Sequence, residues 1–294
     1  MSQTLIAPSR IDTVLAVEPE GQQEASAALQ AISRGGPTLG GIPSYTSVEA
    51  QRHAMLEHMA GAFRVFARRG YDEGLAGHIS LRDPEHPNAF WTNPFGRHFA
   101  LLKAQDMILV NEAGEAIGGN NKHPVNAAGF LIHSALHKRR PDVHAACHMH
   151  STYGRAWSVF GRRLDMITQD SATFFGDAQA VYDDFGGIVF KDEESEKLAQ
   201  ALGPKGKALI LRNHGLLTVG QTVDEAAFLF TLMERCCQIQ LLVEAAEANG
   251  TPKKLMSEEA AEYTFRASDP AVLYCEFQPE LELEMELSGG AFSL

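Results

Sequence analysis

The chain has 294 residues, of which 45% are hydrophobic and 21% charged, and its formal net charge is −12. This composition is typical of a globular protein with a sizeable core. The negative charge excludes a non-specific nucleic-acid surface, which requires a positive field, so local donors must meet any anionic ligand.

Neither a membrane nor a secretory route is expected from the sequence. We find no apolar run of the roughly 18–20 residues that a bilayer requires, and the acidic first thirty residues do not resemble a signal or transit peptide. The four cysteines have no framework spacing, which favours reduced thiols and a cytoplasmic location; they are Cys147, Cys236, Cys237 and Cys275.

The first half of the chain alternates between helical and strand patterns. Residues 1–45 are predicted to be a tail and linker, because they end in the Gly- and Pro-rich "SRGGPTLGGIPSYTS". Thr46 or Ser47 is expected to cap a helix that ends near Arg69. Strands are predicted in "GLAGHISLRDP", "AFWTNPFG" and "DMILVNEAGEAIGG", and a helix in "NAAGFLIHSALHKRR".

The second half continues with a strand in "DVHAACHMHS" and two strands around a turn in "GKALILRNHGLLTVG". A solvated helix face is predicted in "KDEESEKLAQALG", and a long helix runs from Thr222 or Asp224 to Gly250. Residues 251–294 are predicted to be a C-terminal extension whose "FQPELELEMELSGG" forms a tail or an edge strand. The pattern predicts one α/β domain over residues 46–250, with a mostly antiparallel sheet layered by helices.

Three histidines suggest a metal site. His148 and His150 alternate on a predicted strand, so both project from one face about 6.5–7 Å apart. His214 follows a second strand at a tight turn between Asn213 and Gly215. Three imidazoles with one open position form a catalytic type of zinc site. The alternative is a set of sheet and turn histidines that hold no metal.

Another pair of histidines offers a competing site. His133 and His137 are four residues apart on a predicted helix and could also chelate a cation. They lack the glutamate of an H-E-x-x-H motif, and three basic residues follow His137. A shared metal is therefore not favoured for this pair, and lining a pocket is a candidate role for His133. Surface or loop positions are expected for the remaining candidates, His53, His58, His86 and His123.

Four segments together resemble the class II aldolase/adducin family: "GHISLRDP", "FWTNPFGRHF", "HSALHKRRPDVHAACHMHS" and "ALILRNHGLLTVG". The resemblance covers about residues 47–250. It implies a three-layer α/β/α sandwich around a largely antiparallel central sheet. It also implies a divalent metal on His148, His150 and His214, most simply Zn²⁺, with Mn²⁺ or Fe²⁺ as alternatives. Many members are homotetramers, so we expect a homo-oligomer.

The sequence departs from the sugar-phosphate aldolases of that family. The position of their catalytic glutamate is occupied by Gly129, and the position of their proton-donating tyrosine falls near Gln169. Their phosphate-binding Ser-Ser pair is replaced by Asn126 and its neighbours in "VNAAGF", which resembles the adducin-type branch. The usual proton shuttle is therefore missing.

The residues and the resemblance together favour a metal-dependent lyase that cleaves a carbon–carbon bond of a small hydroxy or keto acid or other carbonyl compound, by aldol cleavage or decarboxylation. Candidates for the missing proton carrier are His78, His133, Tyr153 and Asp170. The loop "WTNPFGRHF" matches the family's anion-binding loop, and the lost Ser-Ser pair favours a carboxylate over a phosphate. The expected substrate-binding residues are Thr92, Asn93, Gly96, Arg97, Asn126 and Gln169. A non-catalytic adducin-like scaffold and a small-molecule sensor remain the alternatives.

Overall fold

A computed structural model describes residues 21–22, 25–33, 38–184 and 192–293. Its main feature is an eight-stranded sheet in the order β6-β5-β4-β3-β7-β10-β9-β8. All neighbouring strands are antiparallel except β8 and β9. The strands are β3 (His78–Arg82), β4 (Ala89–Thr92), β5 (Ile108–Asn111), β6 (Ala116–Gly119), β7 (Ala145–Met149), β8 (Gln179–Tyr182), β9 (Ala208–Leu211) and β10 (Gly215–Gly220); β1 (Gly21–Gln22) and β2 (Pro43–Ser44) form a separate ribbon.

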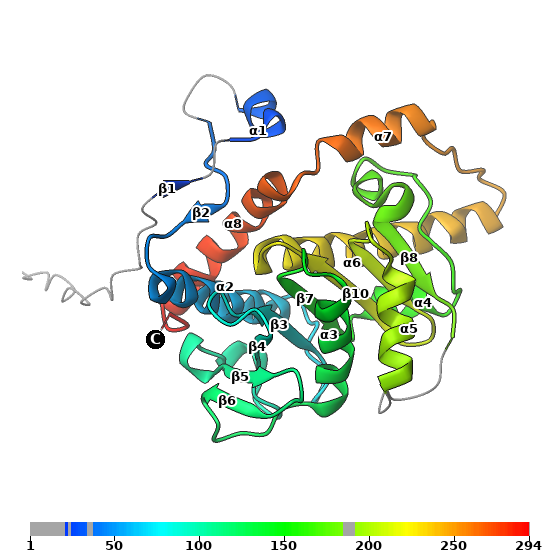
Figure 1. Ribbon diagram of the computed structural model, residues 1–294. Coiled ribbons are helices and arrows are strands. Elements are labelled where there is room, and N and C mark those ends of the chain that lie inside the picture. Colours follow the sequence, from blue (N-terminus) through cyan, green and yellow to red (C-terminus); the bar gives the residue numbers. More distant parts are fainter. Residues whose placement is uncertain (1–20, 23–24, 34–37, 185–191, 294) are drawn as a thin grey trace, which may run out of the picture.

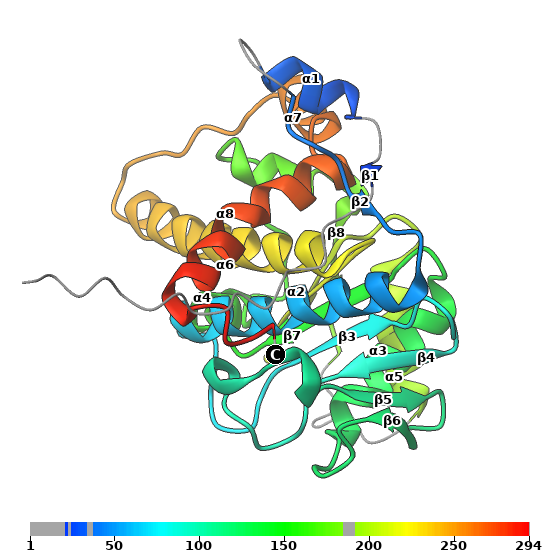
Figure 2. The same ribbon diagram turned by 90° about the vertical axis from the view of Figure 1, so that its left-hand side faces the viewer.

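Helices cover both faces of the sheet (Figures 1 and 2). On β7, Ala146 packs with residues of α3 (Ala127–Arg139) and α5 (Asp192–Leu202). Cys147 and Met149 point the other way, toward α2 (Val48–Arg68) and α6 (Val223–Ala248), as the alternation of a strand requires. The expected three-layer α/β/α sandwich is confirmed. The remaining helices are α1 (Ala27–Ile32), α4 (Thr152–Ser158), α7 (Glu258–Arg266), α8 (Pro270–Ser288) and the 3-10 helices η1 (Phe99–Leu101), η2 (Ala104–Asp106), η3 (Asp170–Phe174) and η4 (Gly176–Ala178).

Side-chain caps fix where the long helices begin. The hydroxyl of Ser47 accepts the amide of Ala50 at 3.0 Å, and the hydroxyl of Thr222 accepts the amide of Glu225 at 3.1 Å. Each bond satisfies an amide that the first helical turn leaves unpaired. The predicted starts of α2 and α6 are therefore confirmed.

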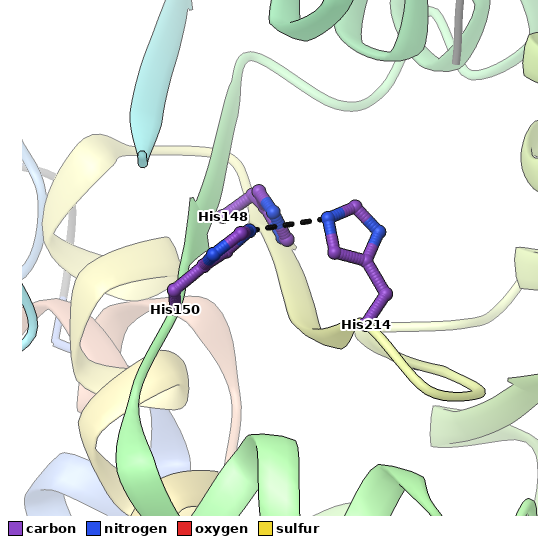
Figure 3. Close-up of side chains that lie close together, drawn as sticks. All are labelled: His148, His150 and His214. Carbon is purple, nitrogen blue, oxygen red and sulfur yellow. Dashed lines mark hydrogen bonds between the residues drawn. The ribbon is translucent and has the colours of Figure 1, made fainter. Parts of the chain in front are cut away.

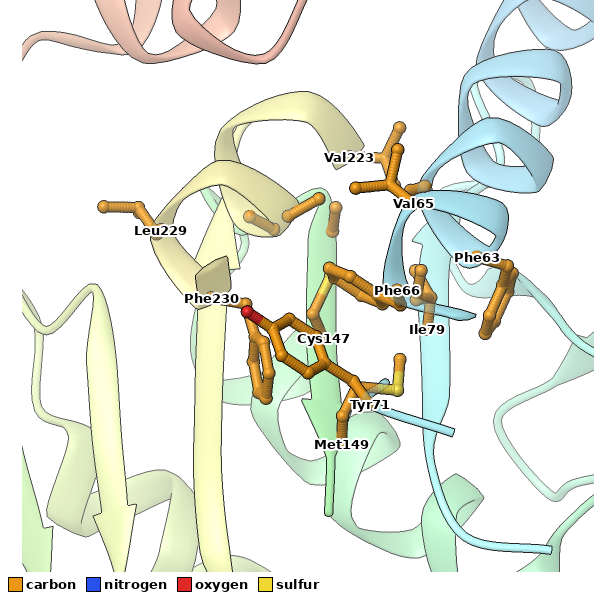
Figure 4. Close-up of a cluster of buried hydrophobic side chains, with 14 of the residues drawn as sticks. Phe63, Val65, Phe66, Tyr71, Ile79, Cys147, Met149, Val223, Leu229 and Phe230 are labelled. Carbon is orange, nitrogen blue, oxygen red and sulfur yellow. The ribbon is translucent and has the colours of Figure 1, made fainter. Parts of the chain in front are cut away.

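Helix α6 is the core helix of the domain. By length and composition it could cross a bilayer, a property that the sequence analysis missed. It packs instead against β7, β10, α2 and α8. Figure 4 shows Leu229 and Phe230 of α6 in one apolar cluster with Phe66 of α2 and Cys147 of β7. Burial of such side chains stabilises a fold by about 1.5–3 kcal/mol each.

The prediction of a tail or edge strand near the C-terminus is wrong. These residues form α8, which begins at an Asp269 cap followed by Pro270 in the first turn. Phe277 and Leu281 are buried against the core, and Glu284 pairs with Arg68 of α2. The alternating pattern of "ELELEMEL" is typical of a strand, but Leu, Glu and Met are also strong helix formers.

The N-terminal tail prediction is covered only in part. Residues 1–20, 23–24 and 34–37 lie outside the described residues, and the described part contains β1, α1 and β2. The division of the chain at residues 45 and 250 stays a prediction.

Candidate metal centre

The three histidines meet at one end of the sheet. His148 lies in β7, and His150 follows the last residue of that strand. β10 is antiparallel to β7 and pairs Leu216 with Met149, so the turn that precedes β10 lies beside the end of β7. That turn carries His214, which points toward the other two rings (Figure 3).

The backbone of the β9–β10 turn explains this placement. Asn213 has a φ of 60°, in the left-handed region that asparagine tolerates better than most residues. Gly215 has a φ of 152°, and a Cβ there would lie 3.4 Å from the carbonyl oxygen of Met149. The Asn-His-Gly sequence therefore suits a tight turn that brings His214 close to β7.

The distances fit a single cation. One ring nitrogen from each histidine lies within 4.8 Å of the others. The Nε2 atoms of His150 and His214 are 3.2 Å apart. Zinc–nitrogen bonds of about 2.0–2.1 Å at a tetrahedral angle give a separation of about 3.3 Å between ligand nitrogens. The Nδ1 atom of His148 donates to the carbonyl oxygen of Leu216 at 2.7 Å, which leaves its Nε2 lone pair for a metal.

The protonation state also suits a metal. Burial lowers the pKa of His148 well below its ordinary value, and His214 and His78 lower it further. Burial, followed by the charge of His150, lowers the pKa of His214 to about 4. The pKa of His150 is lowered by burial and by Arg155. Neutral imidazoles are the form that binds metal ions.

Burial distinguishes the three candidate ligands. His148 is only 2% exposed, whereas His150 and His214 are partly exposed. A cation held by the three rings would therefore have one side open to solvent or substrate, as catalytic sites require.

A second cluster of possible ligands, made of Asp83, Glu85 and His86, has a different character. The carboxylate of Asp83 accepts hydrogen bonds from Arg52 and from Trp91 Nε1, both at 2.7 Å. Burial alone would raise the pKa of Asp83, but these bonds lower it to about 2. The Asp83 carboxylate is therefore already paired and hydrogen-bonded within the protein.

Glu234 of α6 supports the segment that leaves the metal centre. This buried carboxylate accepts the Ser151 hydroxyl at 2.6 Å and the amides of Tyr153 and Gly154 at 2.8 and 2.5 Å. It therefore caps the N-terminus of α4, which begins two residues after His150. The sequence analysis missed Glu234, because a cap from 80 residues away leaves no local pattern.

Two of the predicted proton carriers lie beside the metal centre. The β3–β7 register places His78 directly opposite His148, with ring centroids 5.1 Å apart. His78 Nδ1 lies 2.8 Å from Nε2 of His133, on α3. Burial lowers the pKa of both histidines well below its ordinary value.

The ring nitrogens of His133 and His137 make hydrogen bonds within the protein, which argues against a metal shared by this pair. Nδ1 of His133 lies 2.6 Å from the hydroxyl of Ser80, and the same hydroxyl lies 2.7 Å from Nε2 of His137. Nδ1 of His137 lies 3.1 Å from the carbonyl oxygen of Val143. The two histidines therefore belong to a hydrogen-bonded chain that runs from the carbonyl oxygen of Val143 to His78.

Gly129 explains the space that His78 occupies. This glycine lies in the first turn of α3, at the position where the family resemblance led us to expect a catalytic glutamate. A Cβ at position 129 would lie 2.4–2.8 Å from three atoms of the His78 ring. Such distances are far below van der Waals contact, so the His78 ring fills the space that a side chain at position 129 would enter.

Thr92 and Asn126, predicted to bind substrate, share a small cavity with His78 and His133. Its volume is about 10 Å³, close to the room for one water molecule. The Thr92 hydroxyl donates to the carbonyl oxygen of Ile79, and the Asn126 side chain accepts the amide of Gly129 as the cap of α3. Both side chains therefore line the cavity and also make hydrogen bonds that stabilise the fold.

The other predicted substrate-binding residues lie elsewhere. Arg97 pairs with Asp106 at 2.9 Å, and Gly96 adopts a φ of 86° in the preceding turn. The Oδ1 atom of Asn93 is buried and has no hydrogen-bond partner among the described residues. Gln169 is exposed just before η3. Their role in binding stays a prediction.

The two remaining candidates for proton transfer are exposed. Tyr153 lies in the first turn of α4, beside Glu234. Asp170 lies in η3, which packs against α6 and α7. Their catalytic role also stays a prediction.

Comparisons with known proteins define the family. Residues 57–241 match the "Class II Aldolase and Adducin N-terminal domain", and the chain therefore belongs to the class II aldolase/adducin family. It is 42% identical over 254 residues to the meiotically up-regulated gene 14 protein of Schizosaccharomyces pombe, covering 86% of this chain and 98% of that protein. It is 43% identical over 217 residues to the decarboxylase NovR of Streptomyces niveus, covering 73% of this chain and 77% of that protein.

A solved structure agrees with this assignment. The L-fuculose 1-phosphate aldolase of Glaciozyma antarctica PI12 superposes with a TM-score of 0.78 at 42% identity, covering 85% of this chain and 96% of that one. The family and these neighbours support a lyase-type function, as the sequence analysis expected.

Proposed function

We propose that this protein is a metal-dependent lyase that cleaves a carbon–carbon bond of a small hydroxy or keto acid or related carbonyl compound. The observation that carries the proposal is the convergence of three neutral imidazoles, His148, His150 and His214, on one partly open position. A decarboxylase and an aldolase among its similar proteins support the reaction class.

The three histidines would hold the cation, most simply Zn²⁺, with Mn²⁺ or Fe²⁺ as alternatives. When bound, a divalent cation supplies a Lewis acid that withdraws electron density from a substrate oxygen. The remaining chemistry belongs to side chains that position the substrate and transfer protons.

His78 is the best placed proton carrier of the four candidates. It lies against His148, and burial together with His133 keeps it neutral. In aldol cleavage, a neutral imidazole would take the proton of the substrate hydroxyl. In decarboxylation it would instead orient a water or hydroxyl that returns a proton to carbon. General acid–base catalysis of this kind contributes about 10²–10⁴-fold to a rate.

Decarboxylation requires less of the site. CO₂ leaves with no base acting on a hydroxyl, and one proton returned to carbon completes the reaction. Because Gly129 provides no carboxylate, a site that relies on His78 suits decarboxylation at least as well as aldol cleavage. A carboxylate on the substrate would be bound by the loop from Thr92 to Arg97, and Asn126 and Gln169 are the further candidates for substrate contacts.

The proposal includes a homo-oligomer, with a tetramer as the expected form, and a cytoplasmic location. The four cysteines are all free, which fits a reducing compartment. Partners other than a small-molecule substrate are not part of the proposal.

The alternative is a non-catalytic scaffold of the adducin type. The family name joins aldolases with adducins, so membership alone does not decide between them. The proximity of three ring nitrogens from His148, His150 and His214, with the pKa of each histidine lowered, favours the enzyme, because a scaffold has no need of neutral imidazoles around an open position.

The proposed activity is tested by incubating protein loaded with Zn²⁺ or Mn²⁺ with panels of 2-hydroxy acids, 2-keto acids, aromatic hydroxy acids and sugar phosphates. Release of CO₂ and of aldehyde is followed in parallel, with His214→Ala treated identically as the control. We expect one kind of release, absent from the variant. No release from any panel by protein that holds its metal would overturn the proposal.

A further inference from the structure

The chain of hydrogen bonds behind the metal centre has a direction that its chemistry fixes. It begins at the carbonyl oxygen of Val143, which can only accept, so Nδ1 of His137 must carry the proton of their 3.1 Å bond. His137 is buried, and burial followed by Arg82 lowers its pKa to about 3. A neutral imidazole carries one proton, so Nε2 of His137 has a free lone pair.

The Ser80 hydroxyl continues the same donor-to-acceptor order to His133 on α3. Its single hydroxyl proton goes to Nε2 of His137 at 2.7 Å, because that atom can only accept. The Ser80 oxygen must therefore accept its second bond, and Nδ1 of His133 donates it at 2.6 Å. Since His133 is also neutral, its Nε2 carries a lone pair.

The last bond sets the state of His78. Nε2 of His133 can only accept, so the proton of the 2.8 Å bond lies on Nδ1 of His78. The only other ring nitrogen of His78, Nε2, is then unprotonated. It lies on the edge of the ring that faces Gly129.

We propose that Ser80 and His137 are positioning residues that hold His78 in the tautomer protonated on Nδ1, with a lone pair at Nε2. Nε2 of His78 can then accept a hydrogen bond or a proton from a molecule in the cavity that His78 lines. It cannot donate a hydrogen bond there, because the one ring proton is on Nδ1. Its use in catalysis rests on the proposed function, whereas the tautomer itself follows from the hydrogen bonds alone.

Without the chain nothing fixes this choice, because the two tautomers of neutral imidazole differ little in energy in water. Neither Ser80 nor His137 contacts the three candidate ligands through any hydrogen bond found among the described residues. Their effect on the centre must therefore pass through His133 and His78.

Solid-state ¹⁵N NMR of protein labelled only at histidine tests the proposal directly, because protonated and unprotonated ring nitrogens have well separated shifts. The resonances of His78 are assigned by their loss in His78→Gln. In metal-free and in Zn²⁺-loaded protein we expect a protonated Nδ1 and an unprotonated Nε2. A proton on Nε2, or an even mixture of tautomers, would overturn the proposal.

Ser80→Ala removes the link between His137 and His133, so we expect His78 to become a mixture of tautomers. Ser134→Ala is the matched control: Ser134 lines the same cavity, but its buried hydroxyl has no hydrogen-bond partner among the described residues. We expect the control to keep the wild-type tautomer. An unchanged tautomer in Ser80→Ala would refute the positioning role.

Zinc affinity distinguishes this inference from the proposed function. Ser80→Ala should change the dissociation constant for Zn²⁺ less than about threefold, since no ligand is removed. If wild-type protein binds no metal or releases no product, but His78 shows the expected tautomer, the proposed function fails and this inference stands. If the activity is found but His78 does not show the expected tautomer, the proposed function stands and this inference fails.

Discussion

Replacement of Gly129 by alanine tests the packing on which the position of His78 depends. The added methyl group would lie 2.4–2.8 Å from three atoms of the His78 ring, so the ring or the start of α3 must move. Overpacking of a buried site costs about 1–3 kcal/mol, and loss of the His78–His133 hydrogen bond adds about 1 kcal/mol. Alanine returns up to about 1 kcal/mol through its higher helix propensity. We therefore expect a net loss of about 1–3 kcal/mol.

Thermal and denaturant unfolding measure this loss, and each kcal/mol corresponds to roughly 2–4 °C in Tm for a domain of this size. The double variant Gly129→Ala/His78→Ala supplies the control, because removal of the ring leaves room for the methyl group. In the His78→Ala background the glycine substitution should be neutral or stabilising. If Gly129→Ala is equally harmless in the wild-type background, the ring does not occupy that space.

Further predictions concern acid stability and the support of α4. His137 has a folded pKa of about 3, below its ordinary 6.5, so its contribution is fully present above pH 6.5 and is lost as the pH falls toward 3. Between pH 7.5 and 5.5, the free energy of unfolding of His137→Phe should therefore fall by about 1.4 kcal/mol less than that of wild type, and equal falls in denaturant titrations would contradict this. Glu234→Ala removes the cap of α4 and should lower the free energy of unfolding by about 1–3 kcal/mol. It should also weaken zinc binding through His150, which calorimetry at constant pH can measure. Unchanged stability would refute the capping role.

The sequence predicted the sheet and the proximity of His148 and His150 well because their signals are local. Alternation along one strand was enough to place His148 and His150 on the same face. The Asn-His-Gly sequence indicated a tight turn from which the His214 side chain could point into a cleft. That the turn lies beside the end of β7 depends on the antiparallel register of β10 and β7, which the structure shows. The family resemblance implied the three-histidine set but not this register, and the residues alone did not indicate it.

The parts that sequence analysis missed depend on distant contacts. Glu234 caps α4 from another helix, and the contact of His78 with Gly129 joins β3 to α3. The C-terminal helix is different, because Asp269 and Pro270 are a standard helix start that outweighs the alternation that follows.

The most direct test of the account is the metal content and affinity of the purified protein. Calorimetric titration of metal-free protein with Zn²⁺ should give one binding site per chain. His214→Ala should lower the affinity by more than the roughly 10–100-fold that loss of an outer-shell contact costs, while His53→Ala on α2 should leave it unchanged. Failure of the wild-type protein to bind Zn²⁺ or Mn²⁺, or binding that survives in His214→Ala, would contradict the central claim.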